Sequence, residues 1–437
     1  MLFNSFGFIC LIPVVLFVYY LALHVCRRGG NTSVNRTGNI MLLVLSYGFF
    51  FTHQPAYTLL LFGITAVTYI FGLIFSHLPQ DTPHQRRRRW LLVSAAVILV
   101  VLPLAIFKYS NFLLDLSRSI LTPAGIDTGN TKFSFIVPLG ISFFTFQALG
   151  YMWDVYYGRF PAEKNFADYM LFVAFFPQIA SGPISRASTL LPQIKQTRRL
   201  DWADLTAGIR LLLWGYFLKA VFADRVAIIA NPVFNNYEYY SGATCFLGSI
   251  MYSLQIYGDF AGYSLMAIGI GRMFGFRLPG NFSRPYFSAS VSEFWRRWHI
   301  SLSAWLRDYV YIPLGGSRKG KVRTYGNLFT TFLVSGIWHG ASLTFVFWGL
   351  LHGLFQSIEK FFSISNRPEG RFWLIVRITL TFLLVNFAWI FFRMPSFSDS
   401  IHFIGKIFTA TPGLAIKPSN IDSLITVSYT HLTLPTT

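Results

Sequence analysis

His339 is the residue of this sequence best suited to acid–base chemistry. It lies in the segment SGIWHG, residues 335–340, between the apolar stretches 328–334 and 343–351. Ionisable side chains are costly in such surroundings and are therefore candidates for function. Burial disfavours the charged imidazolium, and a neutral imidazole is what a general base needs. Gly336 and Gly340 would leave room for a substrate or a break in the helix. The alternative is a core histidine bonded to a neighbouring carbonyl group.

Two further histidines compete with His339. His352 lies thirteen residues later in the chain. On one continuous helix it would point about 220° away from His339, so we expect His352 to be structural. His299 lies in FWRRWHISLS, residues 294–303, whose aromatic and arginine side chains are typical of an interfacial helix. The sequence leaves open whether this helix lies at the headgroups or brings His299 into the protein towards His339.

A basic stretch around and beyond His299 could bind an anionic substrate. Arg307 is followed by Asp308, its potential partner, and the other basic residues of the stretch are Arg296, Arg297, Arg318, Lys319, Lys321 and Arg323. Such a surface suits a phosphorylated acyl donor, either acetyl-coenzyme A or an acyl carrier with a phosphopantetheine arm. The alternative is that these residues only determine membrane topology.

Several other kinds of chemistry find no support in the sequence. Residues 315–321 resemble a phosphate-binding loop, but Val322 stands where the magnesium-binding hydroxyl would be. The sequence contains no H-E-x-x-H zinc motif and no G-x-S-x-G nucleophile motif. Its three cysteines form no C-x-x-C pair. We therefore expect no bound metal and no bound cofactor.

The elements that must position these residues are membrane helices. Hydrophobic residues make up 54% of the 437 residues and charged residues 12%, and a soluble core could not hide so much apolar surface. Apolar runs predict about ten to twelve membrane segments, some of them re-entrant. The first run, residues 6–25, is expected to be a retained helix, since it lacks the features of a signal peptide. The runs 243–274 and 327–362 are each long enough to hold two segments.

The charge pattern predicts the orientation. The formal net charge is +19, and the basic residues gather between apolar runs, which favours a membrane topology signal over nucleic-acid binding. Basic residues follow the first run, precede residue 90 as Arg86–Arg89, and follow the run that ends near 184. Placing all of them in the cytoplasm puts the N-terminus outside. Arg86–Arg89 could also bind lipid headgroups.

Together these segments resemble the membrane-bound O-acyltransferase family. The resemblance rests on Trp338-His339-Gly340 and on residues 294–303 and 307–316, and it extends over about residues 1–410. Further matching stretches are MLFNS at 1–5, VPLGISFFTF at 137–146, FPQ at 176–178, SGP at 181–183, YGDFAGYS at 257–264 and NFAW at 386–389. The branch that the sequence resembles most contains the membrane subunits of alginate O-acetylation, and teichoic-acid D-alanylation is a more distant relative.

The resemblance implies an all-α polytopic membrane protein with a central tunnel. It implies that His339 is the catalytic histidine and that His299 occupies the family's second polar position. We expect six further residues to bind substrate, namely Arg296, Arg297, Trp298, Arg307, Asp308 and Trp338. The expected reaction is transfer of an acyl group, foremost acetyl, from a cytoplasmic donor to an extracytoplasmic polysaccharide or to a partner protein that modifies it. The expected location is the bacterial inner membrane, among lipids and extracytoplasmic acetyltransferase-like partners.

Other readings stay open at this point. D-alanyl or another acyl group could be transferred to a cell-envelope polymer, or the chain could be a transporter or flippase for a lipid-linked sugar. A scaffold for an extracytoplasmic enzyme is a third possibility. The membrane domain is expected to cover residues 1–415. Residues 416–437 form a polar tail that we expect to be truncated or non-native at its end, because that end fits no family pattern, and we expect residues after about 417 to pack poorly.

Overall fold

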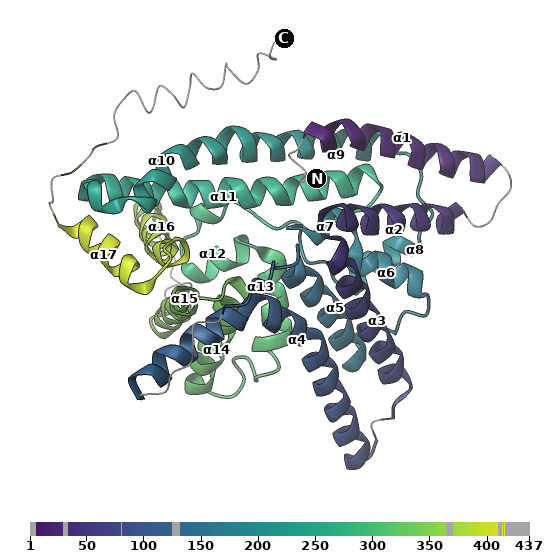
Figure 1. The fold of residues 1–437 in the computed structure, drawn as a ribbon, viewed down its shortest axis with the longest axis horizontal. Helices are drawn as coiled ribbons and strands as arrows, with labels where there is room; N and C mark the ends of the chain where they lie inside the picture. Colours follow the sequence, from purple (N-terminus) through teal and green to yellow (C-terminus); the bar gives the residue numbers. More distant parts are fainter. Residues whose placement is uncertain are drawn as a thin grey trace, which may run out of the picture. The chain divides into compact units, whose positions relative to one another are not determined.

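The part of the chain that a computed structural model describes is mainly α-helical (Figure 1). The described residues are 6–28, 34–79, 81–124, 132–363 and 370–409, together with Gly413 and Ala415. Within these ranges there is no β-strand, and the predicted all-α fold is confirmed. The prediction for the tail falls on residues 416–437, which lie outside the described part.

The chain forms two compact units. The first contains residues 1–212 and 266–279, and the second contains residues 213–265 and 280–437. Two of the three unit boundaries fall within the helices α9 (Trp202–Tyr216) and α11 (Gly242–Met273), and the third follows Pro279 in the segment after α11. The prediction of one membrane domain over residues 1–415 stays a prediction.

The first unit is built from long helices followed by shorter ones. Its α-helices, besides the shared α9 and α11, are α1 (Phe6–Arg28), α2 (Val34–His53), α3 (Pro55–His77), α4 (Pro83–Leu121), α5 (Ile141–Tyr156), α6 (Phe166–Ala174), α7 (Phe176–Ile179) and α8 (Ala187–Lys195). A short 3₁₀ turn, η1 (Thr122–Ala124), follows α4.

The second unit carries the predicted site residues on a mixture of short and long helices. Its α-helices, besides those shared, are α10 (Asp224–Asn235), α12 (Val291–Arg297), α13 (Ile300–Leu306), α14 (Lys321–His339), α15 (Leu343–Phe361), α16 (Arg371–Arg393) and α17 (Phe397–Phe408). It also contains the π-helical turns η2 (Phe217–Ala223) and η5 (Arg307–Tyr311) and the 3₁₀ turns η3 (Tyr237–Tyr239) and η4 (Pro285–Phe287).

The two longest apolar runs fold differently. The run at 243–274 is one helix, α11, although its length would have allowed two segments. The run at 327–362 does contain two helices, because α14 ends at His339 and α15 begins at Leu343. The difference lies in the residues at the centre of each run: Gly340 and Ser342 interrupt the second, and the Ser342 side chain caps α15 by accepting from the Thr344 backbone N–H.

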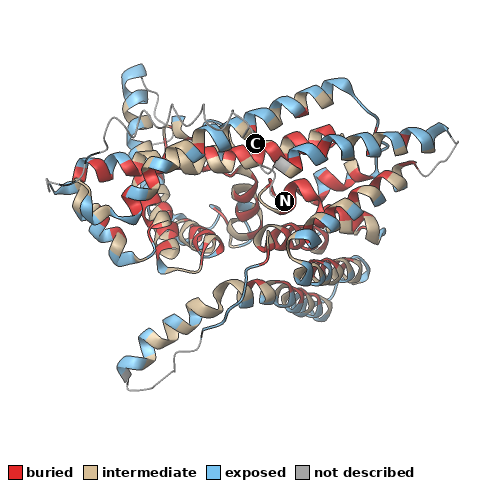
Figure 2. Ribbon diagram, turned by 45° about the horizontal axis from the view of Figure 1, so that its top comes forward, coloured by how far each residue is buried: buried red, intermediate tan, exposed pale blue. Residues whose placement is uncertain are grey.

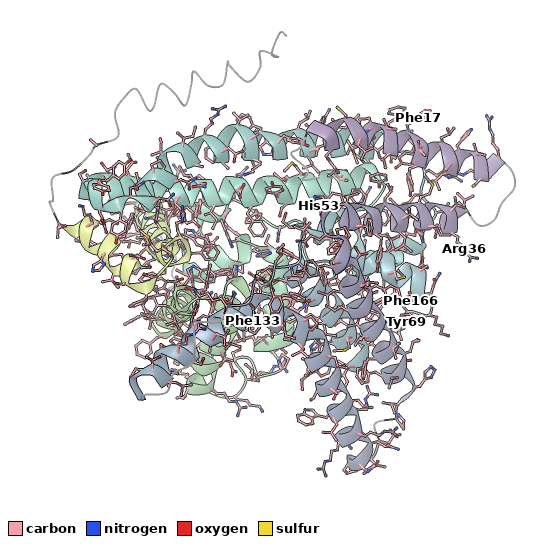
Figure 3. The ribbon with its side chains drawn as sticks, viewed as in Figure 1. Phe17, Arg36, His53, Tyr69, Phe133 and Phe166 are labelled. Atoms are coloured by element: carbon pink, nitrogen blue, oxygen red, sulfur yellow. The ribbon has the colours of Figure 1, made fainter. Side chains whose placement is uncertain are left out.

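Four of the described helices are long and apolar enough to cross a bilayer. They are Gly7–Arg28, Pro55–His77, Pro83–Leu121 and Arg371–Arg393. Their outer faces carry large apolar side chains: Phe17 is 68% exposed and Ile98 is 63% exposed. Exposed residues run along several long helices in Figure 2, and Phe17 is labelled on α1 in Figure 3. Exposing apolar faces of this extent is unfavourable in water but favourable in the hydrocarbon of a bilayer. The chain is therefore a multi-pass membrane protein.

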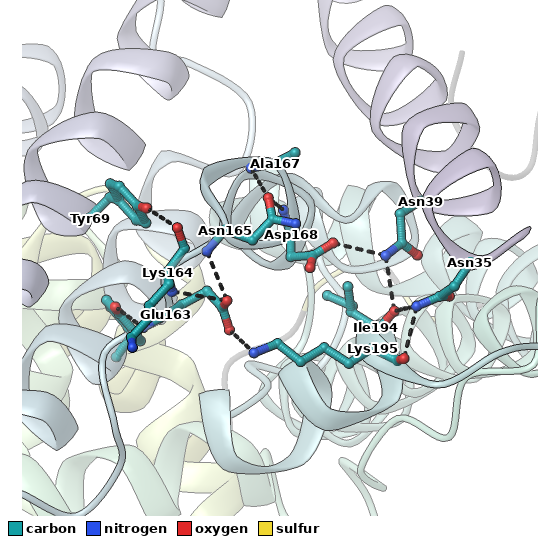
Figure 4. Close-up of polar contacts among 11 residues, drawn as sticks. Asn35, Asn39, Tyr69, Glu163, Lys164, Asn165, Ala167, Asp168, Ile194 and Lys195 are labelled. Carbon is teal, nitrogen blue, oxygen red and sulfur yellow. Dashed lines mark hydrogen bonds and ion pairs between the residues drawn. The ribbon is translucent and has the colours of Figure 1, made fainter. Parts of the chain in front are cut away.

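Polar contacts tie the short helices of the first unit to α2 (Figure 4). The buried Glu163 carboxylate pairs with Lys195 Nζ at 2.6 Å and also accepts from two backbone N–H groups. Asn39 of α2 donates to Asp168 Oδ1 at 2.8 Å and to the Ile194 carbonyl oxygen at 3.0 Å. These bonds join α2, α6 and α8, and each buried charge has a partner, as burial in apolar surroundings requires.

Arg89 differs from the other members of the arginine run. It is buried, and its guanidinium donates to the carbonyl oxygens of Phe75, Leu78 and Tyr156 at 2.6–3.2 Å. Arg86, Arg87 and Arg88 are exposed. The hydrogen bonds of Arg89 therefore connect α4 to the C-terminal ends of α3 and α5. This structural role is separate from any effect of its charge on topology.

The core of the second unit is aromatic. Trp298, Trp348 and Trp389 are almost completely buried there, and the Trp348 and Trp389 rings stack with 5.7 Å between centroids. Residues of α12, α14, α15 and α16 contribute to this core, and aromatic side chains contact the three histidines that the sequence singled out. Close-packed indoles have few alternative rotamers, so they hold the imidazoles in fixed positions.

Candidate active site

His299 lies at a sharp break between two short helices. It follows α12 and caps α13 with left-handed backbone angles, φ 43° and ψ 53°. This conformation costs free energy for a residue other than glycine and must be held by its neighbours. Asn281 holds it: the Asn281 carbonyl oxygen accepts from the Ile300 N–H at 3.0 Å, and its side-chain oxygen accepts from the Ser301 N–H and hydroxyl.

The His299 side chain points into the protein interior. It is 1% exposed, and its ring meets Phe260 edge to face at 4.6 Å between centroids. The Trp338 ring lies 6.0 Å away on another side. Burial, and secondarily the nearby His339, lower the pKa of His299 well below its usual value, so the ring is neutral. Between the two sequence-based alternatives, the structure favours the helix that carries His299 into the protein.

His339 is the last residue of α14 and is only partly buried. Its Nδ1 lies 2.7 Å from the Ser335 carbonyl oxygen, one turn earlier in the helix. Since a carbonyl oxygen can only accept, Nδ1 carries the proton and Nε2 is the basic position of the ring. The helix therefore fixes both the tautomer and the direction of the imidazole.

The glycines beside His339 serve helix packing. A Cβ added to Gly336 would come within 2.3 Å of the Phe345 carbonyl oxygen. One added to Gly340 would come within 2.1 Å of the Phe345 ring. The predicted helix break is present, but the space beside these glycines is filled by α15, and the expectation that they leave room for a substrate is wrong.

His352 is built into the aromatic core. Its side chain is fully buried, and its Nδ1 accepts from the Trp295 indole N–H at 3.2 Å. Trp348 lies between the histidines, with its ring 4.9 Å from His339 and 5.0 Å from His352. The sequence-based angle between His339 and His352 assumed one continuous helix, and that assumption is wrong because the helix breaks at Gly340. The structural role expected for His352 agrees with its burial and its bond to Trp295.

A pocket of about 560 Å³ lies beside this group. Exposed Arg296 and Arg307 line it, as do Thr331 and the fully buried Ser335. It therefore leads from cationic side chains at the surface to the residue whose carbonyl holds His339. The Ser335 hydroxyl is buried and has no hydrogen-bond partner among the described residues, so it could donate to a ligand that enters the pocket.

The structure brings together some of the predicted residues and separates others. His299 and His339 both contact Trp338, whose ring lies 4.9 Å from that of His339. Arg307 pairs with Asp308 at 2.7 Å, as the sequence suggested. Arg297 pairs with Glu293 and does not line the pocket, and Trp298 is packed in the core.

The remaining basic residues of the stretch lie outside the pocket. Arg318, Lys319, Lys321 and Arg323 are exposed around the start of α14 and do not line the pocket. Within the described ranges no three His, Cys, Asp or Glu side chains are grouped as a metal would need. The sequence reasoning missed Phe260, Asn281, Ser335 and Trp348, because nothing in their spacing shows that they surround the histidines.

Known proteins similar to this chain share one kind of chemistry. The profile described as "MBOAT, membrane-bound O-acyltransferase family" matches residues 161–397, which include both site histidines. The protein named "Probable alginate O-acetylase AlgI" of Pseudomonas syringae pv. tomato is 40% identical over 412 residues, which cover 94% of this chain and 75% of that protein.

Two relatives carry names for other polymers. The "Peptidoglycan O-acetyltransferase" of Helicobacter pylori is 36% identical over 82% of this chain and 72% of its own length. The "Teichoic acid D-alanyltransferase" of Bacillus subtilis is 27% identical over 90% of this chain and 98% of its own length. The three names share the transfer of an acyl group, either acetyl or D-alanyl.

Proposed function

We infer that this chain, which belongs to the membrane-bound O-acyltransferase family, acetylates hydroxyl groups of a polysaccharide outside the cytoplasm. O-acyl transfer is the chemistry of the family. The acetyl group and the polysaccharide are proposed from the relatives named for alginate and peptidoglycan O-acetylation. The proposed location is the bacterial inner membrane with the N-terminus outside, and the proposed partners are extracytoplasmic acetyltransferase-like proteins.

The observation that carries this proposal is the fixed direction of His339. With Nδ1 held by the Ser335 carbonyl, Nε2 is the position that takes a proton from an acceptor hydroxyl. The hydroxyl oxygen then attacks the carbonyl carbon of an acetyl thioester. The C–S bond breaks, the thiolate leaves, and the proton on Nε2 is available to neutralise it.

His299 is proposed to assist at the carbonyl oxygen. Its ring is neutral because of burial, and a neutral imidazole can donate one hydrogen bond. It shares Trp338 as a neighbour with His339, and that places the two imidazoles around one region of the interior. A donor aimed at the developing oxyanion stabilises the transition state by a few kcal/mol.

The pocket lined by Arg296 and Arg307 is proposed to receive the acyl donor. Two exposed guanidinium groups suit the phosphates of coenzyme A or of a phosphopantetheine arm. The buried Ser335 hydroxyl is proposed to contact the thioester end, since Ser335 lines the pocket and its carbonyl oxygen accepts from His339. The likeness to a D-alanyltransferase makes D-alanyl thioesters the second candidate donor.

Replacing the base tests the proposed reaction. We expect His339→Ala to reduce acetylation of the exported polymer by about a hundred- to ten-thousand-fold, since a general base contributes that much. The measurement is the acetyl content of the polymer from a strain that lacks the native gene and carries each variant at matched abundance. His402→Ala is the matched control, because His402 is an exposed histidine of α17. Normal acetylation by His339→Ala would contradict the proposed acyltransferase function. It would favour the hypothesis that the chain is a transporter or a scaffold.

Replacing the pocket arginines tests the donor site. We expect the Arg296→Gln, Arg307→Gln double variant to raise the apparent KM for the donor about tenfold or more and to leave the acceptor dependence unchanged. Initial rates in inside-out membrane vesicles, with acetyl-coenzyme A and with an acetylated carrier protein, would measure this. The matched control is Arg318→Gln, Arg323→Gln, which removes the same charge outside the pocket. Equal effects of the two double variants would refute a donor site in this pocket.

A further inference from the structure

A second cavity lies far along the chain from the histidines, within the first unit. It is a groove of about 860 Å³ between α1 and α9. The α9 wall consists of Leu205, Ile209 and Leu212, and Met273 adds to it. None of the proposed catalytic or donor-binding residues lines this groove, so acyl transfer does not account for it.

The α1 wall is a continuous apolar stripe. Residues at intervals of three or four positions face the groove, beginning with Ile9, Ile12, Leu16, Tyr20 and Leu23. The eighteen-residue interval from Ile9 to Arg27 corresponds to about 27 Å of helix, which is close to the thickness of the hydrocarbon core. An extended acyl chain fits along such a stripe. α1 is also one of the helices long and apolar enough to cross a bilayer.

One end of the groove is cationic. His24, Arg27, Arg198 and Arg199 line it there, whereas no carboxylate belongs to its lining. The Arg27 guanidinium donates to the Arg198 carbonyl oxygen at 3.2 Å, and this bond brings two basic stretches of the sequence together. Arg27 and Arg199 are exposed, so their side chains can reach an anion at the groove end.

Arg27 and Arg199 are the residues at this end that can bind an anion, because the charged groups around them already have partners. The Arg198 guanidinium is already occupied by Tyr19, Asn39 and the Gln193 carbonyl group. Asp204 pairs with Arg272 at 2.9 Å and with Arg277 at 3.5 Å. The Asp201 carboxylate accepts from the Ala203 N–H at the start of α9.

We propose that this groove binds one anionic phospholipid of the bilayer, with an acyl chain along α1 and the headgroup phosphate at Arg27 and Arg199. A partner transmembrane helix would match the apolar walls but would leave the cationic end without an anion. A phospholipid matches both, since anionic lipids are attracted to basic residues at the membrane surface. The site is independent of the acyl-transfer reaction.

Native mass spectrometry of the purified full chain tests this site. The probe is phosphatidylglycerol added to the protein in detergent, with phosphatidylethanolamine as the neutral comparison. We expect one retained phosphatidylglycerol, and at least about tenfold weaker retention in the Arg27→Gln, Arg199→Gln double variant. The matched control is Arg318→Gln, Arg323→Gln, which removes two exposed arginines that do not line this groove and should retain the lipid like the unaltered chain.

A second variant separates loss of the site from loss of the fold. Ile209→Trp fills the groove from the α9 wall and leaves every arginine in place, because Ile209 is an exposed groove residue. We expect it to reduce phosphatidylglycerol retention as well, with an unchanged melting temperature in lipid-free detergent. Retention that is equal for the two lipids would overturn the proposal. The proposal would also be overturned if both Ile209→Trp and the Arg27→Gln, Arg199→Gln double variant retained as much phosphatidylglycerol as the unaltered chain.

Discussion

Each site histidine takes its chemical state from one local feature. His339 owes its tautomer to the Ser335 carbonyl, which can accept only from a protonated Nδ1. His299 owes its neutrality to burial, and His352 owes its orientation to the Trp295 indole N–H. Three residues of one type are therefore proposed to have three roles, those of base, neutral donor and structural acceptor. The surroundings distinguish them, which the sequence spacing could not do.

The neutrality of His299 predicts how stability depends on pH. Its pKa is lowered in the folded chain, so the unfolded chain binds more protons below about pH 6.5, and folding loses stability as the pH falls through that value. Between pH 7.5 and 5.5 this one residue should cost about 1.4 kcal/mol. We expect the melting temperature in detergent to fall less over this range for His299→Gln than for the unaltered chain.

The control for this pH effect is His402→Gln, which removes an exposed imidazole. Its pH dependence should match that of the unaltered chain. If His299→Gln showed the same drop in melting temperature as the unaltered chain, His299 would not be buried in the neutral form. Only single variants should be compared, because the effects of substitutions at residues that share one aromatic core do not add.

At the scale of elements, the crossing of α14 and α15 sets the position of His339, the proposed base. Gly336 lies against the Phe345 carbonyl oxygen, and Gly349 lies against the Phe332 carbonyl oxygen, so the two backbones meet without side chains between them. His339 and Trp348 are carried on the two helices of this crossing. A wider crossing would move the imidazole away from Trp348 and from the pocket.

A methyl group at the crossing should therefore damage the protein. We expect Gly336→Ala to destabilise the fold by about 1–3 kcal/mol, since its Cβ would come within 2.3 Å of a carbonyl oxygen, and to lower acetylation. Gly326→Ala is the matched control on the same helix, because its Cβ would meet nothing within 4 Å. Alanine there should be neutral or slightly stabilising. Similar melting temperatures and activities for the two variants would show that the crossing tolerates widening.

The elements were more predictable from the sequence than the contacts between them. Apolar runs revealed the helical class and the positions of most long helices, because side-chain transfer energies depend on local composition. The run at 243–274 could not be resolved by length alone, since nothing in the pattern excludes one helix of 32 residues. His339 and His299 were found from their apolar and aromatic context. Asn281, Ser335 and Trp348 act through distant or backbone contacts, which periodicity does not encode.

At the scale of the whole molecule, the apolar outer faces and the basic clusters define how the chain meets the bilayer. The exposed Arg86–Arg88 and the basic end of the α1–α9 groove are two such clusters in the first unit. Lys and Arg concentrate on the cytoplasmic side of membrane proteins. Both clusters should therefore face the cytoplasm, which leaves the N-terminus outside.

Cysteine labelling should reveal this orientation. We expect a cysteine in place of Arg88 to react with an impermeant maleimide only after the cytoplasmic face is opened, because Arg88 is exposed beside the basic run. Cys10 is exposed and Cys26 is partly exposed, so both must first be replaced by serine. A cysteine at the exposed Arg199 serves as a same-side control. Labelling of either site in intact cells would contradict the predicted orientation and place both basic clusters outside the cytoplasm.

The left-handed backbone at His299 has a consequence for the spectrum of mutations that a genetic screen would recover. Glycine, asparagine and aspartate adopt positive φ more readily than other residues, whereas valine, isoleucine and threonine resist it strongly. Inactive alleles with asparagine or glycine at position 299 should still accumulate as full-length protein in the membrane. Alleles with a β-branched residue there should instead be degraded. A screen that selects variants by protein abundance alone would therefore reveal which residues tolerate the left-handed backbone at position 299. A screen that selects variants by acetylation would reveal whether the imidazole is required.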